Sequence, residues 1–250
     1  MNTAAIYVKE AKYEFLKLLR VPAFSLSTIG FPLMFYVLFG LVMNSAATGM
    51  STYLLATYGA FGVIGVCLYG FGVGLANERG LGWLELKQAS PLPPAAYFIA
   101  KLAMSALFSI IVIALLFTLG FTLGHVRLAP FDTLRLAAIL IAGAIPFGAM
   151  GLAFGYFVKP NAAPALTNLI YLPMAFCSGL WIPLQFLPTP LQHFAPFLPA
   201  YHLSRLALGV LGLDQPNAYW GHWAALAAFT MIFLGLARLG YMRDETQRNG

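Results

Sequence analysis

The stretch Asn77–Lys101, NERGLGWLELKQASPLPPAAYFIAK, is a short polar island inside an otherwise apolar chain. It holds five charged side chains, whereas no Asp, Glu, Lys or Arg occurs from Val21 to Asn77 or from Leu102 to Val126. Charged side chains are costly inside a bilayer, so we expect the island to lie in water between two membrane-spanning helices. The island therefore decides the fold around it: two long apolar helices joined by one short polar loop.

The centre of the island, Leu81–Gln88, is long enough for two turns of helix. Ser90-Pro91 is expected to end that helix, because a proline disfavours helical geometry in the residue before it. Pro93-Pro94 suits the first turn of the next helix, where a missing N–H costs nothing. A short rigid helix between two membrane helices could pass a movement from a soluble partner to the membrane body. The alternative is a connecting loop that is merely ordered.

The composition assigns the whole chain to the membrane class. Of its 250 residues 60% are hydrophobic and only 9% are charged, whereas about a quarter of the residues in a soluble domain are charged. We therefore predict an all-α integral membrane protein with a single domain, residues 1–250. In such a protein the net charge of +6 reports orientation rather than nucleic-acid binding. The two cysteines lie in apolar runs, and the four histidines show no spacing typical of metal ligands.

Six membrane-spanning helices are predicted, since a bilayer core needs about 20 apolar residues as helix. Pro32 and Pro146 fall inside two of them, and Trp220 and Trp223 suit anchors at a membrane interface. The predicted spans are Ala23–Met43, Thr52–Ala76, Ala100–Gly124, Leu134–Phe157, a fifth that begins near Pro164, and Tyr219–Leu239.

Residues 4–20 are amphipathic and precede the first span. At 100° per residue, Tyr7, Phe15 and Leu18 fall on one face, whereas Glu14 and Lys17 fall on the other with most of the charged residues. This pattern predicts a helix that lies in the membrane interface with its charged face toward water. A solvated helix beside the membrane is the alternative.

The segment Pro160–Ser204 has 45 residues without one Asp, Glu, Lys or Arg, and it holds eight of the sixteen prolines. As one helix it would run about 68 Å, more than twice the thickness of the bilayer core, so it must break. Either two crossings or one crossing with a re-entrant hairpin would fit. With six crossings and the N-terminus inside, the inner side holds eleven basic residues and the outer side three. A re-entrant hairpin keeps the number of crossings at six, and the distribution of basic residues then agrees with the positive-inside rule. We therefore favour a re-entrant hairpin, residues 183–212, in the outer leaflet.

Several kinds of chemistry lack the residues they need. The middle of each predicted span has no Asp, Glu, Lys or Arg, which disfavours ion-coupled transport. The sequence has no GxxxxGK[ST], HExxH or GxSxG motif, so a P-loop and two common hydrolytic sites are missing. We assign no catalytic, cofactor-binding or metal-ligating residue. A passive channel, an ion-coupled carrier and, less favoured, an intramembrane enzyme stay open as alternatives to a membrane body driven by a separate subunit.

Two motifs resemble those of a known family. Glu78–Leu86 followed by Ser90-Pro91-Leu92 resembles the acidic, glycine-containing loop of ABC-2 type permeases, the membrane subunits of bacterial ABC exporters. The second motif, Ser178–Leu184 with Leu187-Pro188 and Leu198–Tyr201, resembles their external hairpin. Gly82-Trp83 stands here where the family often has Gly-Thr. The resemblance covers essentially the whole chain, and its motifs are loose in sequence but specific in order and position.

The resemblance implies an ATP-driven exporter that contains two copies of this permease and two copies of a separate ABC ATPase. ATP and Mg²⁺ would bind to the ATPase, so this chain would have no cofactor of its own and would not be an enzyme. It would lie in the bacterial inner membrane with both termini in the cytoplasm. The residues implied for ATPase coupling, within a loop at 77–94, are Glu78, Arg79, Leu81, Trp83, Leu84, Glu85 and Lys87. Those implied for an external gate are Trp181, Pro183, Pro188, Pro199 and Tyr201.

The amino-acid composition is the only feature of the sequence that bears on the class of substrate. Aromatic residues make up 15% of the chain and are spread through the predicted spans. A path lined by apolar and aromatic side chains would suit an amphipathic, drug-like or lipid-like substrate. The same side chains could instead face lipid or fill the core.

Overall fold

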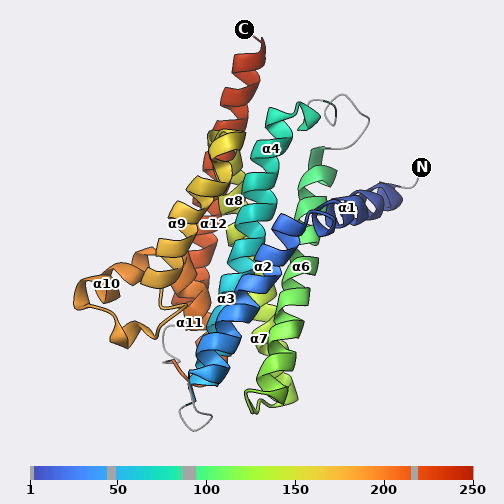
Figure 1. The fold of residues 1–250 in the computed structure, drawn as a ribbon. Helices are drawn as coiled ribbons and strands as arrows, with labels where there is room; N and C mark the ends of the chain where they lie inside the picture. Colours follow the sequence, from blue (N-terminus) through green and yellow to red (C-terminus); the bar gives the residue numbers. More distant parts are fainter. Residues whose placement is uncertain (1–2, 44–48, 85, 87–93, 215–218, 250) are drawn as a thin grey trace.

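The computed structural model describes residues 3–43, 49–84, 86, 94–214 and 219–249, and these residues form helices and no strand. Figure 1 shows a bundle of long helices with both chain termini toward one end. Glu85 and Lys87 of the predicted coupling loop lie outside the described residues, as does the expected helix end at Ser90-Pro91.

Five helices among the described residues are long and apolar enough to cross a membrane. They agree with five of the predicted spans to within a few residues at most of their ends. The exception is the last, whose helix continues for several residues beyond the predicted Leu239. The five are Phe24–Val42, Met50–Gly80, Ala96–Thr122, Pro130–Phe157 and Tyr219–Thr246.

Three of these spans are built from more than one helical segment. The first joins α2, Pro22–Phe35, to a π-helix, Tyr36–Val42. The second joins α3, Met50–Cys67, to a π-helix, Leu68–Val73, and to α4, Gly74–Gly80. The third and last spans are single helices, α6, Pro94–Thr122, and α12, Tyr219–Asn249. The fourth joins α7, Pro130–Ala142, to α8, Ala144–Phe157.

The second span is the centre of the bundle. Nearly every residue of α3 is buried, whereas α12 is mostly exposed along its length. Gly151 of α8 allows a close approach to the backbone of this span, because a Cβ there would lie 2.8 Å from the carbonyl oxygen of Cys67. Gly155, four residues on, would place a Cβ 2.9 Å from the carbonyl oxygen of Gly72. This glycine pair, which fits the GxxxG pattern of membrane helices, therefore packs within the chain.

The fifth predicted span corresponds to α9, Ala163–Cys177, which follows a 3₁₀ turn at Pro160–Ala162. Its 15 residues extend about 22 Å as helix, short of the roughly 30 Å of a bilayer core. After it come a 3₁₀ turn at Leu184–Phe186, α10, Thr189–Phe194, and a second 3₁₀ turn at Ala195–Phe197.

The last helix of this region, α11, Pro199–Val210, packs one face against α3, α7 and α12. In Figure 1, α10 and α11 lie toward the end of the bundle opposite to the chain termini. The proline-rich segment thus breaks into several short helices, as its length required.

The N-terminal amphipathic segment forms α1, Thr3–Leu19, which lies across α6 (Figure 1). One expectation about it is wrong: Glu14 was predicted on the face toward water, but its side chain is buried. Val8 and Leu19, two apolar residues of the helix, are exposed instead. The reason is that Lys101 of α6 offers a charged partner for Glu14, which an isolated helical wheel cannot show.

Candidate functional site

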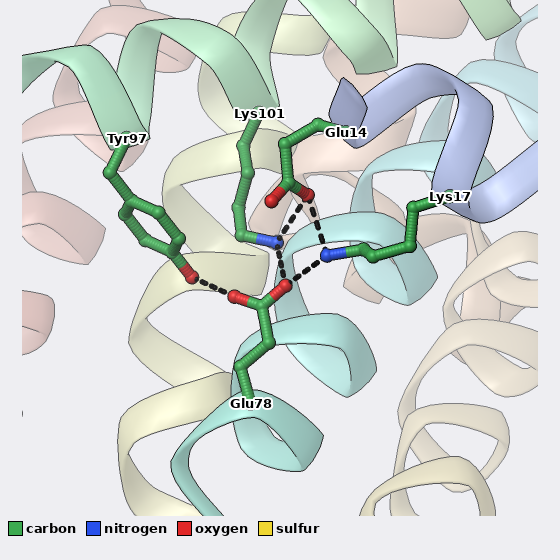
Figure 2. A network of polar contacts seen from close by, with 5 residues as sticks. All are labelled: Glu14, Lys17, Glu78, Tyr97 and Lys101. Atoms are coloured by element: carbon green, nitrogen blue, oxygen red, sulfur yellow. Dashed lines mark hydrogen bonds and ion pairs between the residues drawn. The ribbon is translucent and has the colours of Figure 1, made fainter. Parts of the chain in front are cut away.

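Four charged residues and one tyrosine form a network between the C-terminal parts of α1 and α4 and the N-terminal part of α6 (Figure 2). Glu14 and Lys17 are three residues apart on α1, and Tyr97 and Lys101 are four apart on α6, so each pair shares one helix face. Glu78 stands in the last turn of α4 and completes the group.

The two carboxylates of this network share the two ammonium groups. Lys101 Nζ lies 3.1 Å from Glu78 Oε1 and 3.3 Å from Glu14 Oε2. Lys17 Nζ donates to Glu14 Oε2 at 2.8 Å and also to Glu78 Oε1. The hydroxyl of Tyr97 donates to the other oxygen of Glu78 at 2.6 Å. Each carboxylate is therefore balanced by cations, and the group as a whole carries no net charge.

These contacts link three helices, and most of the charged groups that make them are buried. Glu14 and Glu78 are each 3% exposed and Lys101 is 0% exposed, whereas Lys17 lies at the edge of the network. The pKa of Lys17 is raised above its ordinary value: burial lowers it, but Glu78 and Glu14 together outweigh burial. A buried charge is tolerated when it is paired and hydrogen-bonded, which is the case for each member here. We call these five residues the charge network.

Arg79, the residue after Glu78, links α4 to other helices on its other side. We call the charge network the first junction and the contacts of Arg79 the second junction. Its Nη1 donates to the carbonyl oxygens of Gly155 and Tyr156, both at 2.8 Å, and its Nη2 lies 2.5 Å from Asp244 Oδ1. The guanidinium also stands 5.6 Å from the centre of the Tyr156 ring. Arg79 therefore ties the end of α4 to α8 and to α12.

The residues just after these two junctions present an apolar surface. Leu81, Trp83 and Leu86 are 65%, 46% and 71% exposed. Leu84 faces the opposite way and is buried against Tyr97 and Tyr156. We call Leu81, Trp83 and Leu86 the exposed apolar segment. Of the residues implied for ATPase coupling, Leu81 and Trp83 lie on the surface, whereas Glu78, Arg79 and Leu84 are partnered inside the chain.

The two aromatic residues implied for an external gate lie in separate aromatic groups. The Trp181 ring lies 5.6 Å from both Phe35 and Phe61, measured between ring centres. Tyr201 packs instead against His202 and His222, with the Arg205 guanidinium 5.0 Å from its ring centre.

The three prolines of that set differ in exposure: Pro199 is buried, Pro183 is half-buried and Pro188 is exposed. In the same region the hydroxyl of Tyr53 donates to the carbonyl oxygen of Gly179 at 2.7 Å, which ties this segment to α3. The structure thus anchors both ends of the proline-rich segment to the bundle but does not gather the five residues at one point.

Sequence reasoning missed most of the charge network. Lys101 offered a signal, because a lysine at the head of a long apolar run is costly without a partner. The pair Glu14 and Lys17, three residues apart on a predicted helix, offered another. Neither signal shows which distant residue is the partner. Across the described segments no group of three His, Cys, Asp or Glu side chains could hold a metal ion.

Comparison with known proteins assigns a family to this fold. The family described as ABC-2 family transporter protein matches residues 41–239. The chain is also 26% identical, over 242 residues, to the Bacillus subtilis (strain 168) protein named "Putative transport permease YvfS". That match covers 96% of this chain and 97% of the relative.

Proposed function

This chain belongs to the ABC-2 transporter family, and we propose that it is the permease subunit of an ATP-driven exporter. The family membership and the apolar helices make it a multi-pass membrane subunit of a transporter. A separate ABC ATPase would bind and hydrolyse ATP with Mg²⁺, so the permease itself would need no cofactor. The permease would be driven by movements of that ATPase.

The exposed side chains and the helix contacts around α4 give this proposal its main support. Leu81, Trp83 and Leu86 expose large apolar side chains at the end of the bundle where both chain termini lie. Exposed apolar clusters tend to mark contact sites, and tryptophan is enriched among the residues that dominate binding energy. Directly before this segment, Glu78 ties α4 to α1 and α6, while Arg79 ties α4 to α8 and α12. A partner that moved the segment would therefore move five helices together.

The membrane arrangement that we propose has six crossings with both termini in the cytoplasm of a bacterium, in its inner membrane. The fifth crossing would be α9, completed by the chain that follows it, and residues 183–212 would form a re-entrant hairpin at the outer face. The excess of basic residues at the inner ends supports this orientation. Trp181 and Tyr201 would stabilise the closed state of the outer gate.

The proposed assembly contains two permeases and two ATPases, and the two permeases would enclose the substrate path. The apolar, aromatic-rich bundle suits an amphipathic, lipid-like or drug-like substrate that leaves the inner leaflet or the cytoplasm. ATP binding would draw the ATPases together, and the exposed apolar segments would pass that movement to the spans.

Trp83→Ala is the direct test. We expect it to weaken association with the ATPase by about 2 kcal/mol, roughly 30-fold, and to reduce substrate-stimulated ATP hydrolysis in lipid. Folding should be unchanged, because the side chain is half exposed and lies outside the membrane body. The measurement is affinity between the purified permease and its ATPase, followed by ATP hydrolysis in liposomes.

Trp220→Ala is the matched control. Trp220 is 83% exposed and lies at the start of α12, toward the opposite end of the bundle, so its loss should leave ATPase affinity unchanged. If Trp83→Ala folds normally and leaves both affinity and coupled transport intact, Trp83 is an interfacial anchor against lipid headgroups and the proposed contact is wrong.

A further inference from the structure

A cavity of about 470 Å³ opens beside the second junction, where α4 and α8 end against α12. Three of its lining residues are basic, Arg79, Lys159 and Arg243, and one is acidic, Asp244. Aromatic and other apolar residues, among them Phe157, line the rest. We call this cavity the basic cleft. Its excess of positive charge favours an anionic ligand.

Two of the three cations are available to such a ligand. Arg79 already donates to two carbonyl oxygens and pairs with Asp244, so its charge is used within the chain. Lys159 and Arg243 are both exposed, and no other residue that the structure describes forms an ion pair with either. A lysine and an arginine at one cleft offer the donors that a phosphate group prefers.

The depth of the cleft matches the level of lipid headgroups. Gly80 and Phe157 both line it, and they are the last residues of two candidate spans, Met50–Gly80 and Pro130–Phe157. The span that contains α12 passes the same point with Gly240 and Arg243. The place where apolar helices give way to charged residues is where a bilayer changes from acyl chains to phosphates. Phe157 is 50% exposed, so its ring can contact the first part of an acyl chain.

Close backbone packing gives the cleft a fixed shape. A Cβ at Gly80 would lie 2.3 Å from Pro160 Cγ, and one at Gly240 would lie 2.6 Å from Tyr156 Cβ. Because no side chain fits at either position, the walls are set by helices in contact rather than by flexible side chains. Arg79 adds rigidity, since its contacts to Gly155, Tyr156 and Asp244 hold α8 and α12 together at the same place.

We propose that the basic cleft binds the phosphate of an anionic phospholipid, with Lys159 and Arg243 as its ligands. Phe157 contacts the lipid just below the headgroup. The bound lipid bridges the end of α8 and α12 beside the junction that Arg79 forms. A zwitterionic lipid binds more weakly, because the positive charge of its headgroup opposes that of the cleft.

The test compares two short-chain lipids on the full chain in detergent micelles. Dioctanoyl phosphatidylglycerol and dioctanoyl phosphatidylcholine are titrated separately, and binding is followed by thermophoresis. We expect phosphatidylglycerol to bind about 30-fold more tightly, since each basic residue near a membrane surface contributes about fivefold. The double variant Lys159→Gln/Arg243→Gln should bind the two lipids equally.

Two further variants keep the result interpretable. Lys12→Gln/Arg238→Gln removes the same charge from exposed positions outside the cleft and should keep the selectivity. Lys159→Arg/Arg243→Lys keeps the charge of the cleft and should also keep the selectivity for phosphatidylglycerol. This variant separates loss of the ligands from misfolding. Selectivity that survives Lys159→Gln/Arg243→Gln, or that disappears equally in Lys12→Gln/Arg238→Gln, overturns the proposal.

Other sources of a negative charge are distinguished in the same assay. Inorganic phosphate that displaces phosphatidylglycerol at micromolar concentration would show a site for free anions and overturn the lipid assignment. Loss of ATPase association in Lys159→Gln/Arg243→Gln, with lipid selectivity unchanged, would show instead that an acidic surface of a protein partner occupies the cleft.

Discussion

Removing the ammonium group of Lys101 tests the charge network most sharply. The side chain is fully buried, and its Nζ lies 3.1 Å from Glu78 Oε1 and 3.3 Å from Glu14 Oε2. Lys101→Met keeps the length of the side chain but leaves two buried carboxylates to share Lys17, whose side chain is 31% exposed. Removing one partner of a buried ion pair costs about 3–5 kcal/mol, because an uncompensated charge remains. We expect a loss of that size in the free energy of unfolding.

A second substitution should recover most of this loss. Glu78→Gln in the Lys101→Met background removes one negative charge and leaves Glu14 and Lys17 as a pair, 2.8 Å apart. No net buried charge remains, and buried ion pairs are often close to neutral relative to uncharged replacements. The double variant should therefore be more stable than Lys101→Met alone, with a coupling energy of about 2 kcal/mol between the two positions.

The assay is equilibrium unfolding of the full chain in mixed micelles, followed by tryptophan fluorescence. Arg135→Met serves as the control, because Arg135 and Asp132 form an exposed pair at 3.5 Å, worth no more than about 1 kcal/mol. The reasoning is refuted if Lys101→Met costs no more than Arg135→Met. It is also refuted if Glu78→Gln adds to the loss instead of reversing it.

Three further outcomes are expected. Gly151→Ala should lower stability by about 1–3 kcal/mol in the same assay, because its Cβ would meet backbone atoms of the second span, whereas Gly235→Ala, with nothing within 4 Å, should not. Arg79→Lys should speed hydrogen exchange or proteolysis at the end of α12 near Asp244, because a lysine cannot make the three contacts of the guanidinium; unchanged protection would contradict this. Since the pKa of Lys17 is raised above 10.5, its contribution is complete below that pH and is lost progressively as the pH rises from 10.5 through the raised value. A stability profile from pH 7 to 11 for wild type and Lys17→Gln checks this, and curves that stay parallel above pH 10.5 would count against it.

The spans could be predicted from the sequence because they depend on one local property, a long run without charge. The second span is apolar on all sides and is the most buried of the five. The need for a break between Pro160 and Ser204 also followed from length alone. The shortness of α9 did not, because a helix can stop inside an apolar run wherever tertiary contacts or prolines favour it. Pro173 lies inside α9 without ending it.

The candidate site was harder to predict, because it depends on pairs that are distant in the sequence. The expectation that Glu14 faces water came from the helix period alone, and that period says nothing about Lys101, 87 residues away. Leu84 was grouped with Trp83 among the residues implied for ATPase coupling, yet the two are adjacent in a helical turn and point to different sides. The helical period correctly predicts that the side chains of Trp83 and Leu84 point in different directions. Which of the two faces inward depends on the packing of Tyr97 and Tyr156.

In the proposed coupling, the adjacency of Glu78 and Arg79 would let a short segment act on a large bundle. Consecutive residues of a helix point about 100° apart, so two charges in sequence reach different neighbours. Glu78 is neutralised by lysines of α1 and α6, and Arg79 by Asp244 of α12 and by carbonyl oxygens of α8. Neither side chain can follow a movement of α4 without moving its partners, because separating a buried charge from its partner is costly. The exposed apolar segment begins two residues after Arg79. Only a short length of chain that could bend therefore separates Trp83 from both junctions, and a force on Trp83 acts close to them.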